Sequence, residues 1–256
     1  MNSPLALLTT LVNNELSGEQ QSETHWQDKS RTGLAMCGRI RQAGDGEQYM
    51  ETLNWNPRAI LNDVQAPKFN VPPGTRPLTL HRLGDGSEQV ERMFWGYKPA
   101  WYKRGPASNA RLDTVLNGSP FWLPLLTRRI LVPAEGWYEW IGEKTSKQPW
   151  YIHAKNDAPI LMAAIAAWSP GAEMNAAHGF AIVTDDAAGG MVDIHDRRPI
   201  VLAPEDALAW LDPATRVEDA LAMLTTPRPE SAFVWHPVTP AMGNSRYQLA
   251  DASEPF

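Results

Sequence analysis

Cys37 is the only cysteine of the chain, and it directly follows a methionine in the run Met36-Cys37-Gly38-Arg39. A single thiol can form neither an internal disulfide nor a thiolate cluster for a metal ion. A small buried apolar side chain is the usual state of a free cysteine. Removal of Met36 would give Cys37 a different chemistry, because an N-terminal cysteine carries an amine and a thiol on adjacent carbons. Gly38 would leave room beside the thiol, and Arg39 could hold an anion close to it.

A second candidate segment, Ser108-Asn109-Ala110-Arg111, combines an uncharged hydrogen-bonding side chain with a guanidinium. Asn109 and Arg111 are two residues apart, so their side chains share a face if the segment is an extended strand. The structural alternative, which the sequence leaves open, is a hydrogen-bonding pair at the edge of a loop.

Glu139 is the candidate acid-base carboxylate, because it lies between Tyr138 and Trp140 in a segment that follows a predicted strand. Aromatic surroundings disfavour the charged form of a carboxylate and raise its pKa, which suits proton transfer near neutral pH. Alternatively, Glu139 projects outward while Trp140 packs inward. Glu135 would lie on the same face of a continuous strand and is the second choice.

His195 is the candidate histidine, because acidic and basic residues surround it. Asp193 or Asp196 could orient the imidazole and fix its tautomer, as a general acid-base histidine often requires. We interpret four other histidines as structural: His81, His153, His178 and His236.

Several cofactor and metal sites are excluded by missing motifs. The chain has no phosphate-binding glycine loop of the Walker or dinucleotide type and no His-Glu-x-x-His helix. With one cysteine, a zinc deaminase cluster is impossible. We expect neither a metal nor a cofactor.

Composition indicates an ordinary globular protein of 256 residues with 43% hydrophobic and 20% charged residues. A net charge of -6 argues against coating of duplex DNA by bulk electrostatics. The net charge does not exclude a local basic groove, because several arginines lie beside the candidate motifs. These arginines are Arg39, Arg41, Arg111, Arg128, Arg129, Arg197 and Arg198. No segment has the apolar length that spans a bilayer. Residues 5–12 lack the basic flank of a signal peptide, and we expect a cytoplasmic monomer.

The hydrophobic pattern predicts a β-rich chain with a few short helices. The 22 prolines and 11 tryptophans favour a loop-rich β fold with aromatic surfaces that could stack on bases. Alternation on both sides of Gly84-Asp85-Gly86 predicts a hairpin from residues 77–82 and 90–95. Further strands are predicted at residues 129–133, 149–153, 160–167, 179–184 and 233–237, and helices at 48–53, 204–210 and 217–224.

The predicted fold class is α+β, a single domain on a mainly antiparallel, partly barrel-like sheet. Residues 1–35 are polar and weakly periodic, and we interpret them as a disordered leader or as sequence upstream of the true start. The domain then covers residues 36–247, and residues 248–256 are expected to form a loose tail.

The chain resembles the SOS-response-associated peptidase family, the abasic-site processing proteins. The resemblance rests on six motifs in the family's order: Met36-Cys37-Gly38-Arg39, Phe69-Asn70-Val71-Pro72-Pro73-Gly74-Thr75, Phe94-Trp95-Gly96-Tyr97-Lys98-Pro99, Asn109-Ala110-Arg111, Glu135-Gly136-Trp137-Tyr138-Glu139-Trp140 and Asp193-Ile194-His195-Asp196-Arg197-Arg198-Pro199. It implies a protein that binds an abasic site in single-stranded DNA and links itself to it covalently.

The resemblance also implies a role for each matching position. Cys37 corresponds to the linking residue, and Asn109, Glu139 and His195 correspond to residues around the sugar. The positions that match DNA-contacting residues are Arg39, Asn70 and Arg111 near the backbone, Pro73 and Trp101 against the bases, and Thr184 in the pocket.

The chemistry of an N-terminal cysteine agrees with this implied role. Its α-amine, with an ordinary pKa of about 7.7–8.0, is partly neutral near pH 7 and can condense with the aldehyde of an opened abasic sugar. The thiol then closes a thiazolidine ring, while Glu139 shuttles protons and His195 protonates the sugar oxygen. Asn109 could hydrogen-bond the sugar without adding charge, and an open imine allows a side lyase reaction.

Two departures from the family pattern stand out. Family members begin at the cysteine after the initiator methionine, whereas residues 1–35 precede Met36 here. We expect a working protein that starts at Cys37, through an internal start or through cleavage, and the family's peptidase name reflects a proposed self-cleavage. Asp113 stands where the family usually has glutamate, and the sequence assigns it no role.

Two other functions remain as alternatives. A cysteine peptidase would use Cys37 as nucleophile and His195 as base, without a free amine. A non-catalytic single-strand binding module would use aromatic stacking and arginines, and its affinity would not depend on an abasic site.

Overall fold

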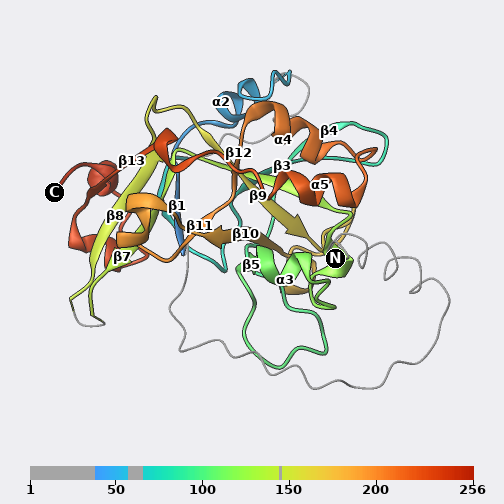
Figure 1. The fold of residues 1–256 in the computed structure, drawn as a ribbon, viewed down its shortest axis with the longest axis horizontal. Coiled ribbons are helices and arrows are strands. Elements are labelled where there is room, and N and C mark those ends of the chain that lie inside the picture. Colours follow the sequence, from blue (N-terminus) through green and yellow to red (C-terminus); the bar gives the residue numbers. More distant parts are fainter. Residues whose placement is uncertain (1–37, 57–65, 144–145) are drawn as a thin grey trace.

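The computed structural model describes residues 38–56, 66–143 and 146–256, and these form an α+β fold built on two sheets (Figure 1). The first sheet has five strands in the order β13-β8-β7-β1-β2, and every pairing in it is antiparallel. Its strands are β1 (Arg39–Gln42), β2 (Lys68–Val71), β7 (Gly136–Ile141), β8 (Gln148–Ala154) and β13 (Phe233–Pro237).

The second sheet has eight strands, with the path β11-β10-β9-β6-β3-β4 and two additional short strands. One of these, β12, pairs with β9, and the other, β5, pairs in parallel with β10. The strands are β3 (Leu78–Arg82), β4 (Glu88–Arg92), β5 (Asn109–Arg111), β6 (Arg129–Ala134), β9 (Ile160–Ala166), β10 (Phe180–Asp186), β11 (Arg197–Pro199) and β12 (Val201–Leu202).

The described helices are short and lie outside the space between the sheets. They are α2 (Gly46–Glu51), α3 (Leu112–Leu116), α4 (Pro204–Leu211) and α5 (Val217–Met223). Single 3₁₀ turns connect other elements: η3 (Leu123–Leu125), η4 (Ala176–His178), η5 (Gly189–Asp193), η6 (Glu230–Ala232), η7 (Pro240–Gly243) and η8 (Ala250–Ser253). Among the described residues, none of these helices has the length and apolar character of a membrane span.

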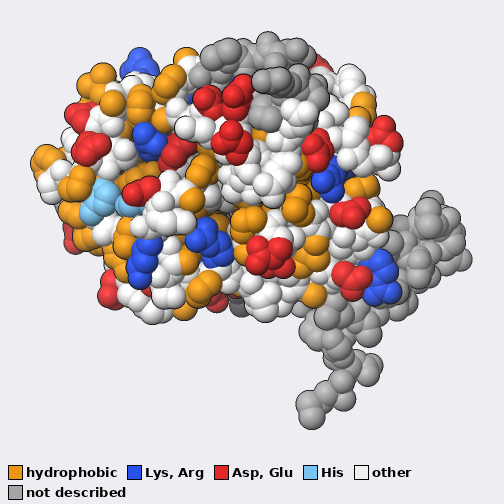
Figure 2. Space-filling model, turned by 90° about the horizontal axis from the view of Figure 1, so that it is seen from above, with side chains coloured by type: hydrophobic (Ala, Val, Ile, Leu, Met, Phe, Trp, Pro, Cys, Tyr) orange, Lys and Arg blue, Asp and Glu red, His pale blue; other side chains and the backbone are white. Residues whose placement is uncertain are grey.

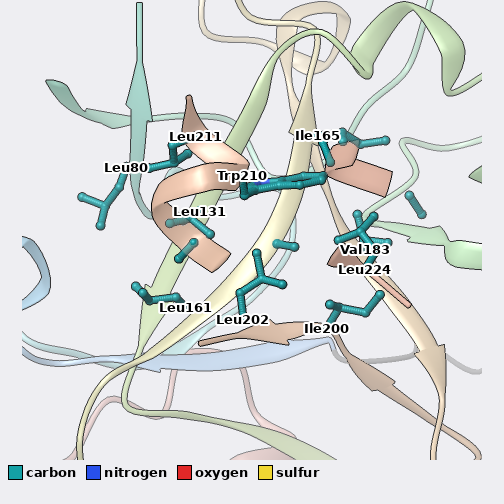
Figure 3. Packing of buried hydrophobic residues seen from close by; sticks show 14 of the residues in the cluster. Leu80, Leu131, Leu161, Ile165, Val183, Ile200, Leu202, Trp210, Leu211 and Leu224 are labelled. Carbon is teal, nitrogen blue, oxygen red and sulfur yellow. The ribbon is translucent and has the colours of Figure 1, made fainter. Parts of the chain in front are cut away.

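Two main hydrophobic cores lie on the two faces of the second sheet. On the outer face, Trp210 of α4 packs among Leu131, Ile165 and Val183 (Figure 3). On the inner face, residues such as Ile182 pack against residues of the first sheet, and we call this the inter-sheet core. Because both faces are covered, β9 is buried at all seven positions, and its alanine-rich sequence forms a strand as predicted.

The predicted hairpin is confirmed by β3 and β4, although β4 begins at Glu88, before the predicted start. The other predicted strands and helices are also present, with ends shifted by one or two residues. The partly barrel-like closure is not found. Among the described strands, the two sheets have separate edges and face each other across the inter-sheet core, because their large apolar faces bury each other without a continuous ladder.

The C-terminal residues are packed, which differs from the expected loose tail. Gln248 accepts a hydrogen bond from Phe69 N at 2.9 Å and donates one to Asn70 O at 2.7 Å, so it continues the edge of β2. Ala252 is completely buried, and the segment lies beside the first sheet (Figure 1). The predicted leader, residues 1–35, lies outside the described residues.

Candidate active site

Glu139 lies on the face of β7 that is turned toward the inter-sheet core. Trp137, two residues earlier on the same face, belongs to this core, and Glu139 itself is only 2% exposed. In the antiparallel pairing of β1 with β7, Arg39 lies opposite Tyr138. Continued by one residue, this register sets Gly38 opposite Glu139. The inward-facing carboxylate therefore neighbours the residue that is bonded to Cys37, which itself lies outside the described residues.

Asn109 and Thr184 come from the second sheet and face the same core. Strand β5 runs parallel to β10, with Asn109 beside Ile182 and Arg111 beside Thr184. Ala110 points to the outer core, so its neighbour Asn109 points to the inter-sheet side. Thr184 is completely buried, and its carbonyl accepts a hydrogen bond from Arg197 at 3.0 Å. Polar residues of both sheets thus face the inter-sheet core.

His195 follows the 3₁₀ turn η5 in the segment that leads into β11. Its Nδ1 lies 2.9 Å from Asp196 Oδ1 and accepts a hydrogen bond from Arg197 N at 3.1 Å. Burial lowers the pKa of His195, and the negative charge of Asp196 opposes this shift. In the neutral ring, the contact from Arg197 leaves the proton on Nε2, so this atom can donate to a ligand. The aspartate in contact with His195 is therefore Asp196, although its side chain is itself 82% exposed.

Glu135, the second-choice carboxylate, has a structural role. It lies between β6 and β7, where the strand is interrupted, so it does not continue the face of Glu139. Its two oxygens accept hydrogen bonds from Ala43 N at 2.8 Å, Gly44 N at 2.9 Å and the Tyr49 hydroxyl. An ion pair with Arg41 at 3.0 Å completes the set, and Glu135 thereby anchors the loop before α2.

Arg39 and Asn70 lie on the opposite face of the first sheet and contact each other. Arg39 Nη1 donates to Asn70 Oδ1 at 2.8 Å, and the guanidinium lies 5.5 Å from the ring centre of Trp140. Asn70 is completely buried and also donates to Asn244 O. In this structure Asn70 therefore supports Arg39, and the half-buried Arg39 is the member of the pair closer to solvent.

Arg111 is nearly half exposed and forms two hydrogen bonds with Asp113, at 3.0 Å and 2.6 Å. This contact holds the pKa of Asp113 below its ordinary value. Asp113, to which the sequence assigned no role, is thus a partner of a predicted DNA-contacting residue. It lies two residues from Arg111, so the spacing alone is a usable signal.

Pro73 and Trp101 are accessible apolar residues. Pro73 is half-buried in a turn that Gly74 N fastens to Trp95 O at 2.8 Å. Trp101 is 61% exposed and rests edge-on against Tyr102 and Phe121. An exposed indole with aromatic support can stack on a base.

Of the paired arginines, only Arg128 is exposed, and it lines a pocket together with Arg82 and Arg129. Arg129 is buried and donates to Trp210 O and Asp212 O, which closes the end of α4. Arg197 and Arg198 are also buried. On the face in Figure 2, cationic side chains are scattered among acidic ones. Within the part of the chain that the structure describes, no group of three His, Cys, Asp or Glu residues is placed to hold a metal ion.

Comparison with known families identifies the family of the chain. The sequence model of the SOS response associated peptidase (SRAP) family matches residues 36–245, which include every candidate residue. The chain belongs to this family.

Relatives of this SRAP protein include abasic site processing protein YedK of Escherichia coli K12, which is 38% identical over 86% of this chain and 100% of the relative. Mouse abasic site processing protein HMCES is 30% identical over 75% of this chain and 66% of the relative. The crystal structure of a phage-related protein from Bordetella bronchiseptica has 50% identity and a TM-score of 0.72, and the match covers 83% of this chain and 99% of that one. These matches confirm the family and the sheet-rich α+β fold.

Proposed function

We propose that this protein binds abasic sites in single-stranded DNA and links itself to them through Cys37 as a thiazolidine. The observation that carries the proposal is the register of β1 and β7. It sets the buried carboxylate of Glu139 across from Gly38, next to the residue that would supply the amine and the thiol. The names of the relatives in E. coli and mouse support the same lesion as the target.

The reaction proceeds by a condensation that is followed by an intramolecular addition. The neutral α-amine of Cys37 attacks the C1′ aldehyde of the opened sugar, and the carbinolamine loses water to give an imine. The thiol then adds across the C=N bond, so that sulfur bonds to C1′ and nitrogen takes the proton. The net change is the loss of one water molecule. Ring closure is intramolecular and benefits from the high effective concentration of fixed groups.

The surroundings of each site residue favour a particular role in this reaction. Glu139, buried beside the start of β1, takes the proton from the attacking amine and returns it to the leaving hydroxyl. His195 donates a proton to the sugar ring oxygen as the ring opens. Asn109, facing the interior from the second sheet, hydrogen-bonds the sugar without adding charge.

The imine also permits a side reaction. Loss of a C2′ proton from the open imine expels the 3′ phosphate, which breaks the strand by β-elimination. Closure of the thiazolidine removes the imine and suppresses this cleavage. We therefore propose a weak lyase activity that competes with capture.

The proposal requires a free amine on Cys37. With residues 1–36 attached, this nitrogen is an amide and cannot form an imine. The start of the family match at Met36 supports a working protein that begins near this residue. Intact mass measurement of active protein from its native cell tests this point, and active protein that retains residues 1–36 contradicts it.

The central experiment mixes protein beginning at Cys37 with a single-stranded oligonucleotide that contains one abasic site, and resolves the products on a denaturing gel. We expect a stable adduct. Glu139→Gln should slow its formation by about 10²–10⁴-fold. Glu143→Gln, on an exposed residue just beyond β7, is the matched control and should react normally.

Two further samples separate the alternatives. Cys37→Ser retains some peptide hydrolysis if the protein is a cysteine peptidase, but it forms no thiazolidine. Protein whose N-terminal amine has been acetylated should capture no DNA. Undiminished capture by acetylated protein would rule out the proposed mechanism.

A further inference from the structure

Glu230 contacts the segment that carries His195. Its Oε1 accepts a hydrogen bond from Met191 N in η5, although the two residues are 39 positions apart. The carbonyl of Met191 in turn accepts hydrogen bonds from Ile194 N and His195 N, each at 3.0 Å. The backbone of His195 is therefore tied to Glu230 through one intervening residue.

The two residues before Met191 are glycines that allow this close approach. A Cβ on Gly189 would lie 2.5 Å from Glu230 Oε2, and Gly189 has a φ of +56°. A Cβ on Gly190 would lie 3.4 Å from the ring of Trp235 in β13. The turn thus packs against Glu230 and Trp235, and a side chain at position 189 would displace the Glu230 carboxylate and would need an unfavourable positive φ.

The end of the segment is also close to Glu230. Arg198, three residues after His195, is buried, and the negative charges of Glu230 and Asp185 act on its guanidinium. Arg198 is fixed in β11 opposite Asp185. The hydrogen bond from Met191 N is therefore the direct contact of Glu230 with this segment, and its charge also acts on Arg198 beyond His195.

We propose that Glu230 is a positioning residue, which holds the His195 segment so that the imidazole meets the sugar ring oxygen. This inference rests on the proposed function, because it assigns His195 the role of proton donor. Glu230 itself does not contact DNA in this proposal. It acts through the backbone of Met191.

The test compares Glu230→Ala and Glu230→Gln in protein that begins at Cys37. Two quantities are measured: the rate of adduct formation on abasic single-stranded DNA, and the affinity for the same oligonucleotide carrying a tetrahydrofuran analogue. The analogue has no C1′ hydroxyl and cannot react, so it reports binding alone. Glu205→Ala, at an exposed position in the first turn of α4, is the control.

We expect Glu230→Ala to slow adduct formation by about 10–100-fold, the effect of a displaced catalytic group, with affinity for the analogue unchanged. Glu230→Gln should recover most of the rate, because its amide oxygen still accepts the hydrogen bond from Met191 N. A parallel loss of rate, affinity and unfolding temperature in both variants would show a merely structural role and overturn the inference.

His195→Ala distinguishes failure of the inference from failure of the proposed role. If His195→Ala slows adduct formation and Glu230→Ala does not, the inference is wrong and the role of His195 stands. If His195→Ala reacts at the wild-type rate, both are wrong.

Discussion

At the residue scale, the two contacts of His195 Nδ1 favour different protonation states. The hydrogen bond from Arg197 N needs a neutral, unprotonated Nδ1, whereas the carboxylate of Asp196 favours the charged ring. Burial lowers the pKa of His195, so the population of the neutral imidazole increases at physiological pH. The imidazolium that acts as acid is then a minority species, and the reaction rate depends on its population.

This balance predicts the pH dependence of adduct formation. Below the pKa of His195 the rate rises with pH, because the Cys37 amine loses its proton. Between that pKa and the amine pKa of about 7.7–8.0, the imidazolium population falls while the neutral amine population rises. The two changes cancel, so the rate is flat. Above the amine pKa the rate falls as the imidazolium disappears.

Single-turnover rates from pH 5 to 10 test this prediction, with His195→Gln as the comparison. The variant should be slower and should level off at high pH without the final fall. A wild-type rate that continues to rise above the amine pKa would contradict an acid role for His195.

The residue-scale predictions succeeded where a short local pattern determines geometry. Asn109 and Arg111 lie on one strand, the case in which their spacing gives them a shared face, and an aspartate does contact His195. Glu135 differs, because its four partners come from residues more than 80 positions earlier. No local pattern reveals such contacts.

At the element scale, the position of β7 depends on Gly136. This residue pairs with His153 in β8, and a Cβ on it would lie 2.3 Å from Ile152 O. Gly136→Ala should destabilise the fold by about 1–3 kcal/mol through overpacking against backbone. Because β7 also carries Glu139, adduct formation should fall as well.

Chemical denaturation measures this change, and Gly84→Ala is the matched control. Gly84 has no atom within 4 Å of its added Cβ and lies in the turn before β4. Its substitution should alter the free energy of unfolding by less than about 0.5 kcal/mol. Equal stabilities of the two variants would show that β7 and β8 tolerate a wider separation.

The C-terminal segment predicts a second element-scale effect. Gln248→Ala removes the partners of Phe69 N and Asn70 O, and unpaired backbone groups at this edge should lower stability by about 1–3 kcal/mol. Leu249→Ala, at a neighbouring residue that is 60% exposed, should have little effect. Thermal unfolding of the two variants provides the comparison, and identical curves would contradict a structural role for Gln248.

Elements were predictable where hydrophobic alternation is long enough. The hairpin of β3 and β4 shows this pattern, whereas β5 has three residues and pairs with β10, which lies more than 70 positions later. The tail was expected to be loose because it is short and contains several polar residues. Hydrogen bonds between Gln248 and β2 hold it in place, and composition alone does not reveal such hydrogen bonds.

At the scale of the whole molecule, His81 makes stability depend on pH. It is 2% exposed, and burial lowers its pKa from 6.5 to about 4. The unfolded chain therefore takes up a proton at His81 before the folded protein does. Stability should fall as pH drops from 6.5 to about 4, by up to about 3 kcal/mol. Glu91, whose pKa burial raises, opposes this loss.

Urea denaturation at pH 7 and pH 4.5 measures the difference in unfolding free energy. His81→Gln has no titrating group at this position, so its stability should change less between the two pH values. If the variant and the wild type lose the same amount, acid sensitivity originates elsewhere.

The fold class was predictable, but the closure of the sheet was not. Strand-rich patterning with short helices indicates α+β, and it fits a closed barrel as well as two facing sheets. The decision depends on which strands pair at the edges. Arginine pairs posed a similar difficulty, since Arg129 looks like a surface cation in sequence and is a buried helix-end contact in the fold.

The inward-facing polar residues divide between two layers, with Glu139 on one and Asn109 on the other. A nucleotide that touches both becomes a bridge across the sandwich. Capture of damaged DNA should therefore stiffen the protein, and amide hydrogens of β7 and β10 should exchange more slowly together once the adduct has formed. Protection confined to one layer would show that the lesion sits on that layer alone.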